Sequence, residues 1–92
     1  MFRLPHHPNA FLSLKPNIQP GLSARTKIIS VLEKQLSTTR RIARETDLSY
    51  TVVPYHLHLL EAEKILSHKG RRLYFWNLTG IGQQKLVSEK LS

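Results

Sequence analysis

The chain has 92 residues, of which 40% are hydrophobic, enough for one small domain with a modest core but not for a second domain. Its formal charge of +8 and its pI near 10.3 favour a polyanionic partner, nucleic acid before an acidic membrane. The absence of cysteine excludes a disulfide framework, a thiolate metal site and a thiol nucleophile. Because no apolar run is long enough to span a membrane and no signal-peptide core opens the chain, we expect a soluble, cytoplasmic protein.

Residues 1–22 are rich in proline and end in Pro20-Gly21, so we expect them to form an arm rather than a helix. The arm is too apolar for a freely solvated linker, which predicts that it packs on the domain or on a partner subunit. Its large apolar residues are Phe2, Leu4, Phe11, Leu12, Leu14 and Ile18. Residues 23–92 are then expected to form the domain itself.

Two helices are predicted in the first half of the chain. Ser23 is the expected N-cap of the first, over about residues 24–35, and Ser37 or Thr38 that of the second, over about residues 39–46. Apolar residues recur in both at helical spacing, which predicts one buried face in each. The residues expected to face inward are Ile28, Leu32, Ile42 and Ala43.

A tight connection follows, in which Asp47 tolerates turn geometry and Ser49 is the expected cap of a third helix, over about residues 50–63. Two helices joined by so short a turn must cross at a steep angle. Pro54 falls in the second turn of the third helix and forfeits the backbone bond to the carbonyl of Tyr50, which predicts a tightened or slightly kinked start.

From Ile65 onwards the pattern changes to two β-rich runs around a Lys-Gly-Arg-Arg tip, which predicts a hairpin. The second run, from Leu73 to Trp76, is apolar on both faces. One face is therefore expected to meet the helices, and the other the arm or a second chain. Thr79 is the expected cap of a final helix over about residues 80–91.

The order helix, helix, tight turn, helix, hairpin, helix is that of a winged helix-turn-helix. The run RRIARETDLSYTVVPYHLHLLEAEKIL resembles ArsR-type and related archaeal and bacterial regulators, with matches at Ile42-Ala43, at Leu48-Ser49 and in HLHLLE at residues 56–61. The run GRRLYFWNLTGIGQQKL is similar to that family's wing strand and the opening of its final helix, through Leu78, Thr79 and Gly82. The resemblance spans about residues 24–86 and implies an α+β, mainly α, winged helix-turn-helix fold.

The chain departs from that family's pattern at three points. Asp47 and Lys64 stand where the family often has glycine, in the turn before the third helix and between that helix and the wing. These departures predict local differences in both turns. The missing cysteines remove the thiolate metal-sensing sites known in part of the family.

The resemblance implies a DNA-binding transcriptional regulator whose third helix enters the major groove and reads base edges with its N-terminal half. The base-reading candidates are Tyr50, Thr51, Pro54, Tyr55 and His58. Because this helix has no Arg or Lys before Lys64, affinity must come largely from contacts to phosphates elsewhere. The phosphate and wing candidates are Arg40, Arg41, Arg44, Ser49, Lys64, Lys69, Arg71 and Arg72. The wing tip is also a candidate for the minor groove.

The expected partner is double-stranded DNA, bound by a homodimer on a pseudo-palindromic operator in the nucleoid. Dimerisation is expected to use the first and last helices, clasped by the apolar arm. Two other classes fit the same sequence. One is an architectural, chromatin-like protein without sequence preference, favoured by the high charge and the arginine-free reading helix. The other is a winged helix used for protein contacts in a transcription or replication assembly, with its Tyr and Trp surface as the interface.

Metal binding, catalysis and cofactors are not expected. His6 and His7 lie on the arm, and His56 and His58 point to different sides of a helix instead of forming an i, i+4 ligand pair. His56 is instead expected to have a structural or backbone-contacting role. No nucleophile with a neighbouring base and no phosphate-cradling glycine loop is present, so an enzyme is not expected. A small-molecule effector is left open.

Overall fold

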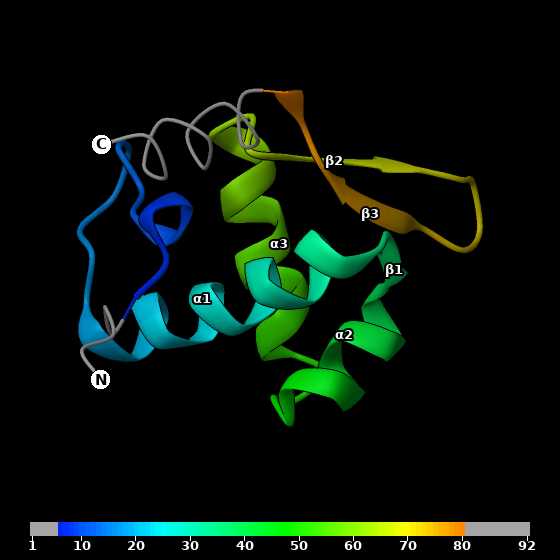
Figure 1. Cartoon of the computed structure of the whole chain (residues 1–92), viewed down its shortest axis with the longest axis horizontal. Helices are drawn as coiled ribbons and strands as arrows, with labels where there is room; N and C mark the ends of the chain where they lie inside the picture. The colour runs from blue at the N-terminus through cyan, green and yellow to red at the C-terminus, as the bar shows by residue number, and fades with distance from the viewer. Residues whose placement is uncertain (1–5, 81–92) are drawn as a thin grey trace.

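The computed structural model describes residues 6–80. In chain order the elements are the 3-10 turn η1 (Pro8–Ala10), α1 (Gln19–Lys34), β1 (Ser37–Thr38), α2 (Thr39–Thr46), α3 (Val52–Ala62), β2 (Leu66–Lys69) and β3 (Phe75–Leu78) (Figure 1). The described part is an α+β fold, mainly helical, with three α-helices and one small antiparallel sheet. The predicted final helix lies outside the described residues from residue 81 onwards.

The sheet has the strand order β1-β3-β2, so the hairpin strand β3 lies in its middle. Trp76 pairs with Ser37 on one side and with His68 on the other. The indole Nε1 of Trp76 also donates a hydrogen bond to the Oγ1 of Thr39, at 3.0 Å. The predicted hairpin is confirmed, and β1, which was not predicted, pairs with the end of β3 nearest the hairpin tip and leads directly into α2.

A single hydrophobic core lies between α1, α3 and the sheet. Residues from all parts of the described chain contribute to it, and its fully buried members include Ile28, Ile29, Ile42, Val53, Leu57, Leu60 and Trp76. Ile42 and Ala43 face this core from α2, as expected, and α2 has the predicted bounds and its predicted cap at Thr38. The buried stripe of α1 is confirmed as well.

The start of α1 differs from the prediction. The helix begins at Gln19, so Pro20 and Gly21 lie in its first turn, and its N-cap position is Ile18 rather than Ser23. A proline in the first turn of a helix loses nothing, because the N–H groups there have no intrahelical partner and its fixed φ suits a helix. The Pro20-Gly21 pair therefore opens the helix instead of ending the arm.

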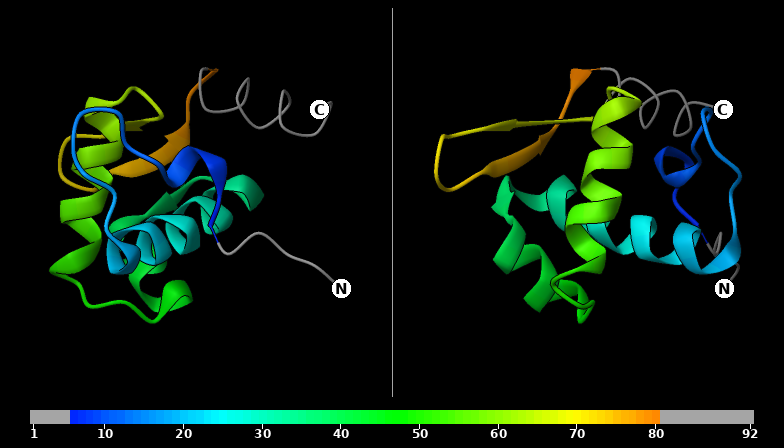
Figure 2. Two further views of the ribbon diagram at one scale, coloured as in Figure 1. Left: turned by 90° about the vertical axis from the view of Figure 1, so that its left-hand side faces the viewer. Right: turned by 180° about the vertical axis from the view of Figure 1, so that it is seen from behind.

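The part of the arm that precedes α1, residues 6–18, packs on the rest of the chain as predicted. Figure 2 shows η1 beside α1. The backbone N–H of His7 donates to the Oγ1 of Thr26 at 2.8 Å. Further along, the carboxylate of Glu63 accepts hydrogen bonds from the N–H groups of Ser13 and Leu14, at 2.9 and 2.8 Å. Ala10 and Leu12 of the arm belong to the hydrophobic core.

The start of α3 also differs from the prediction, by two residues. The helix begins at Val52, so Pro54 is its third residue rather than a member of its second turn. The turn before it is already helical, because the N–H groups of Val52 and Val53 both donate to the carbonyl of Ser49 at 3.2 Å. Pro54 has no N–H to donate to the carbonyl of Tyr50, and the bond from Val52 back to Ser49 is the tightened start that was predicted.

Candidate nucleic-acid interface

The packing of α2 directs its arginines to solvent. Thr38 caps the helix, and its Oγ1 accepts a hydrogen bond from the backbone N–H of Arg41 at 3.2 Å. Because Ile42 is fully buried, the opposite face of this short helix is left to water. The exposed side chains on that face are Arg40, Arg41 and Arg44.

One of these three arginines is held within the protein. With the amide of Gln35 oriented so that its oxygen faces Arg41, that oxygen accepts hydrogen bonds from both terminal guanidinium nitrogens at 2.9 Å. Arg40 and Arg44 make no side-chain hydrogen bond or ion pair within residues 6–80. Their guanidinium groups are therefore available to an external anion such as a phosphate.

The turn between α2 and α3 presents the first two base-reading candidates. Asp47, at its start, has a left-handed backbone with φ of 60°. The Oγ of Ser49 accepts a hydrogen bond from the N–H of Val52 at 3.1 Å, which is the capping role predicted for it. Tyr50 and Thr51 lie in this turn with exposed side chains, and 59% of the Tyr50 surface is accessible to solvent.

The other candidates occupy the solvent face of α3. Tyr55 is 59% exposed and the side chain of His58 is 61% exposed, while Pro54 is half-buried. The opposite face, with Val53 and Leu57, is fully buried. α3 therefore has one core face and one outward face that carries polar groups.

His56 faces inward, unlike its neighbours Tyr55 and His58. It is buried, and its Nδ1 lies 3.3 Å from the Nη1 of Arg25. Because a guanidinium can only donate, Nδ1 must accept, which leaves the proton of the neutral ring on Nε2. Burial, and then the charge of Arg25, lower the pKa of His56 below its ordinary value. This position agrees with the structural role expected for His56.

A group of rings and one carboxylate joins α3 to the hairpin. The Nδ1 of His68 lies 2.6 Å from a carboxylate oxygen of Glu61, and its ring stacks on Tyr74 with a centroid distance of 4.2 Å. His58 meets Trp76 edge-on, with centroids 5.6 Å apart. The half of the hairpin next to its tip therefore contacts α3 through Glu61 and His58, and His58 both packs on Trp76 and remains exposed.

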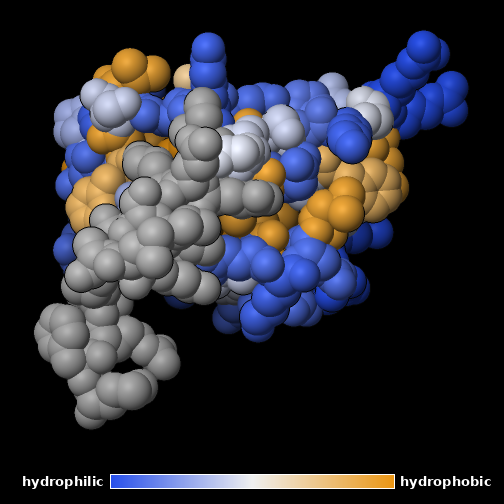
Figure 3. All heavy atoms as spheres, turned by 45° about the horizontal axis from the view of Figure 1, so that its top comes forward, coloured by the Kyte–Doolittle hydropathy of each residue, from blue (hydrophilic) through white to orange (hydrophobic). Residues whose placement is uncertain are grey.

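The hairpin tip is built around Gly70. Its φ is 108°, and a Cβ added there would lie 2.1 Å from the backbone oxygen of Leu73, so only glycine fits. The tip and its flanks carry the exposed cations Lys69, Arg71 and Arg72, and exposed Lys64 lies at the other end of β2. Figure 3 shows hydrophilic side chains projecting at the end of the molecule where the hairpin lies.

A groove of about 560 Å³ brings together side chains from all three predicted DNA-contacting elements. We call it the basic groove; it is lined by Thr38, Thr39, Arg40, Tyr50, Arg72, Leu73 and Tyr74. Arg40 comes from α2, Tyr50 from the turn before α3, and Arg72 from the hairpin tip. No acidic side chain lines the groove. Two guanidinium groups and two phenol rings therefore surround one space that suits an anion.

The remaining predicted site residues lie outside the basic groove. Lys64 follows the far end of α3, and Tyr55 lines a different cavity, between the arm, α1 and α3. Those exposed on the surface but not lining the groove are Arg41, Arg44, Ser49, Thr51, His58, Lys69 and Arg71. The structure therefore brings Arg40, Tyr50 and Arg72 together in one groove and places the other predicted residues outside it.

Sequence reasoning missed four residues that line the basic groove. Thr38 and Thr39 carry hydroxyl groups at the N-terminus of α2, where backbone N–H groups and the helix dipole favour an anion. The predicted N-cap at Thr38 was a usable signal for this role. Leu73 and Tyr74 were assigned to a strand, and the sequence carries no sign that they turn towards α2.

No known protein family, no curated protein and no solved structure matches this chain. Within residues 6–80, no three His, Asp or Glu side chains lie close enough together to hold a metal ion. In that same part of the chain, no helix is long and apolar enough to cross a membrane.

Proposed function

We propose that this chain is a winged helix-turn-helix protein that binds double-stranded DNA in a sequence-specific manner and regulates transcription. The observation that carries the proposal is the basic groove, in which Arg40, Tyr50 and Arg72 line one space without an acidic neighbour. In this reading α2, the turn and α3 form the helix-turn-helix, and the hairpin of β2 and β3 is the wing. DNA in the nucleoid is the proposed partner.

The connection between α2 and α3 supports this reading. Asp47 and Lys64 both have positive φ, of 60° and 64°, a conformation that glycine adopts most readily. They stand at the two positions where the resembled regulators often have glycine. Both positions therefore have a backbone conformation that glycine would also adopt, which supports the resemblance at both ends of α3.

Phosphate binding would come from α2 and the wing. Arg40 and Arg72 approach the groove from opposite elements, and the N-terminus of α2, with its cap Thr38, adds backbone donors. Arg44, Lys69 and Arg71 extend the positive surface on either side. With roughly six to eight phosphates neutralised per dimer, the slope of log K against log salt would be about −5 to −7.

Base reading would come from the exposed face at the start of α3. Tyr50, Thr51 and His58 offer hydroxyl and imidazole groups that exchange hydrogen bonds with base edges, and Pro54 and the Tyr55 ring suit contact with a thymine methyl. The proposed homodimer would place two copies of α3 in successive major grooves, about 34 Å apart. Dimerisation through α1, the arm and the final helix is part of this proposal; a monomeric mass at micromolar concentration by light scattering would contradict it.

One observation favours a second candidate, an architectural protein that binds DNA without sequence preference. No Arg or Lys occurs in α3 from Val52 to Ala62, so the bidentate contact of arginine to guanine is unavailable to the reading helix. Affinity would then rest on phosphates alone.

Selection of bound duplexes from a random pool, at about physiological salt, distinguishes these functions. Enrichment of an inverted repeat with half-sites about ten base pairs apart would support the regulator. Binding without enrichment would favour the architectural protein. A chain that binds no duplex even at low salt would contradict both and direct attention to protein partners.

A further inference from the structure

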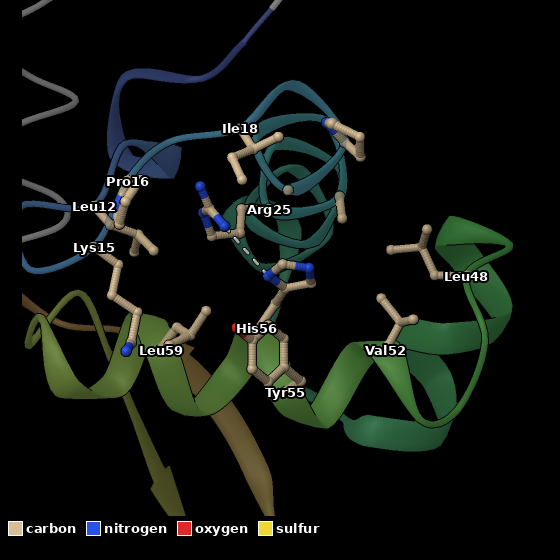
Figure 4. A pocket seen from close by; sticks show the side chains of 13 residues that line it. Leu12, Lys15, Pro16, Ile18, Arg25, Leu48, Val52, Tyr55, His56 and Leu59 are labelled. Atoms are coloured by element: carbon tan, nitrogen blue, oxygen red, sulfur yellow. Dashed lines mark hydrogen bonds between the residues drawn. The ribbon is translucent and has the colours of Figure 1, made fainter.

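A second cavity lies on a different side of α3 and shares no residue with the basic groove. Its volume of about 510 Å³ falls in the range of roughly 300–1,000 Å³ that is typical of small-molecule sites. The arm, α1 and α3 each form one wall, and apolar side chains dominate (Figure 4). Leu12, Pro16 and Ile18 come from the arm, and Val52 and Leu59 from α3. The surroundings suit an apolar molecule.

The inner end of this cavity carries a buried arginine. Arg25 is only 3% exposed and, in Figure 4, extends from α1 towards His56 on α3. Its Nε donates to the carbonyl of Ala10 at 2.6 Å, its Nη2 to the Oδ1 of Asn17 at 3.2 Å, and its Nη1 lies 3.3 Å from the Nδ1 of His56. All three partners are neutral acceptors, and these three bonds leave two of the five guanidinium N–H donors unused within residues 6–80.

The charge of Arg25 has no direct counter-ion in the described part of the chain. No carboxylate of residues 6–80 lies within 4 Å of its guanidinium. The carboxylate of Glu63, which acts on Arg25 from a longer distance, accepts hydrogen bonds from the arm instead. Buried guanidinium groups are almost always paired with an anion, because an isolated buried charge is costly. This cavity therefore has a positive inner end that lacks its usual partner.

The other polar groups around the cavity add to the positive potential. Lys15 lines it from the exposed arm, and no acidic residue is among its lining side chains. His56 cannot act as the counter-ion of Arg25, because a neutral imidazole carries no negative charge. An anion with an apolar body would satisfy both the charge of Arg25 and the apolar walls.

We propose that this cavity binds a small carboxylate with an apolar body. The carboxylate pairs with the Arg25 guanidinium in a charge-assisted contact, and the apolar body packs on Leu12 and Leu59. Lys15, at the exposed rim, attracts the anion.

The cavity also adjoins the proposed DNA-reading face. Tyr55 lines the cavity and is at the same time an exposed base-reading candidate on α3. A carboxylate held between the arm and α3 therefore changes the position available to the Tyr55 ring, and with it the affinity for DNA. This coupling rests on the proposed DNA-binding function, whereas binding of the carboxylate does not.

The first experiment uses the full chain without DNA and takes hexanoate as the probe, with 1-hexanol as the uncharged comparison. Titration calorimetry should give saturable binding of hexanoate that is at least about tenfold tighter than that of hexanol, as expected for a charge-assisted contact. Amide chemical shifts should change at the arm and at residues 52–59. Equal affinity for the two probes, or no saturable binding of hexanoate at millimolar concentrations, would overturn the proposal.

Three variants locate the site. Arg25→Met should weaken hexanoate about ten- to a hundredfold, provided that its circular dichroism shows a folded chain. Lys15→Glu changes only an exposed residue and should weaken hexanoate about three- to tenfold, so it decides the question even if Arg25→Met fails to fold. Lys27→Glu makes the same charge change at an exposed position of α1 outside the cavity and should stay within about twofold of the wild type. Equal losses in Lys15→Glu and Lys27→Glu would count against the site.

A second experiment separates this site from the proposed function. Saturating hexanoate should shift the DNA affinity of the wild type by several-fold and leave that of Arg25→Met unchanged. If the chain binds hexanoate but no DNA, the proposed function fails and the carboxylate site stands. If it binds DNA with the same affinity in the presence and absence of bound hexanoate, the coupling is refuted.

Discussion

Asp47 and Lys64 flank α3, one on each side, and both have a left-handed backbone, with φ of 60° and 64°. Among residues 6–80 they are the only residues other than glycine with a positive φ. A left-handed conformation costs an L-residue about 1–2 kcal/mol, less for aspartate, whose short polar side chain bonds locally. The chain thus retains this conformation at both turns without glycine in either.

Replacement of Lys64 by glycine should therefore stabilise the protein. Removal of the left-handed penalty outweighs the loss of about 0.5–1 kcal/mol from the greater freedom of glycine in the unfolded chain, so Lys64→Gly should raise the free energy of unfolding by about 0.5–1 kcal/mol. Lys64→Ala, which keeps the strained backbone, is the matched control. Urea unfolding measures both variants; the same transition midpoint in the two would contradict the strain at this position.

The two arginines of the basic groove should act as non-specific phosphate contacts. Arg40→Gln and Arg72→Gln should each weaken binding to all duplexes alike and reduce the magnitude of the salt slope by about 1 per DNA contact. Lys27→Gln removes the same charge from an exposed position of α1 outside the groove and should leave the slope unchanged. Fluorescence anisotropy over a series of salt concentrations provides the measurement. A slope that responds equally to all three variants would indicate only the effect of net charge.

The exposed rings of Tyr55 and His58 on α3 should determine sequence preference. Tyr55→Ala and His58→Ala should each relax the preference at particular base pairs by about 1–3 kcal/mol. Tyr55 is 59% exposed, so its replacement should change the free energy of unfolding by less than about 0.5 kcal/mol. His58→Ala should also cost some stability, because His58 packs edge-on against Trp76. Binding to duplexes with single substitutions, measured beside urea unfolding, separates the two effects.

The buried His56 should make the protein less stable in acid. Burial and the charge of Arg25 lower its pKa in the folded state, while the unfolded chain takes up a proton near pH 6.5. Stability from this residue is therefore fully present above about pH 6.5 and is lost as the pH falls from there to the folded-state pKa. The loss is at most about 1.4 kcal/mol per pH unit over that interval.

Urea unfolding at neutral and at mildly acidic pH measures this effect. His56→Asn should show a weaker pH dependence than the wild type, since it removes the titrating group. His58→Asn, which replaces an exposed histidine in the same helix, serves as the comparison for the effect of His56→Asn. A pH dependence that disappears in both variants, or in neither, would assign the acid sensitivity to other groups.

Helices and strands that are marked by nearby residues, such as a cap or an apolar face, could be predicted from the sequence. α2 has its predicted bounds because Thr38 is a strong cap and Ile42 lies on the only apolar face of the helix. The start of α1 was placed too late because Pro20-Gly21 was interpreted as a break, although proline in a first turn is favourable. β1 was missed because two residues carry no detectable alternation.

The grouping of site residues depends on tertiary structure and could be predicted only in part. The sequence indicated Arg40, Tyr50 and Arg72 separately, as cations or as a helix-face residue. Their convergence in one groove depends on the pairing of β1 with β3, which joins the hairpin to the start of α2. Nothing in the sequence indicated that Arg25 is buried. In a strongly basic chain, an arginine on a helix is expected to be exposed to solvent, and only the structure shows the burial of Arg25.

The pairing of β1 with β3 sets the spacing between the hairpin and α2 already in the unbound protein. Ser37 and Thr38 are bonded to Trp76 and Phe75 of the hairpin, and Thr38 is also the N-cap of α2. α2, which carries Arg40, and the hairpin, which carries Arg72, are therefore joined through the hydrogen-bonded strand β1. When a partner binds, only the side chains and the hairpin tip would lose conformational freedom. In the proposed complex, a duplex whose backbone spacing differs from that of the groove would itself have to deform, so the protein would read the shape of DNA as well as its base edges.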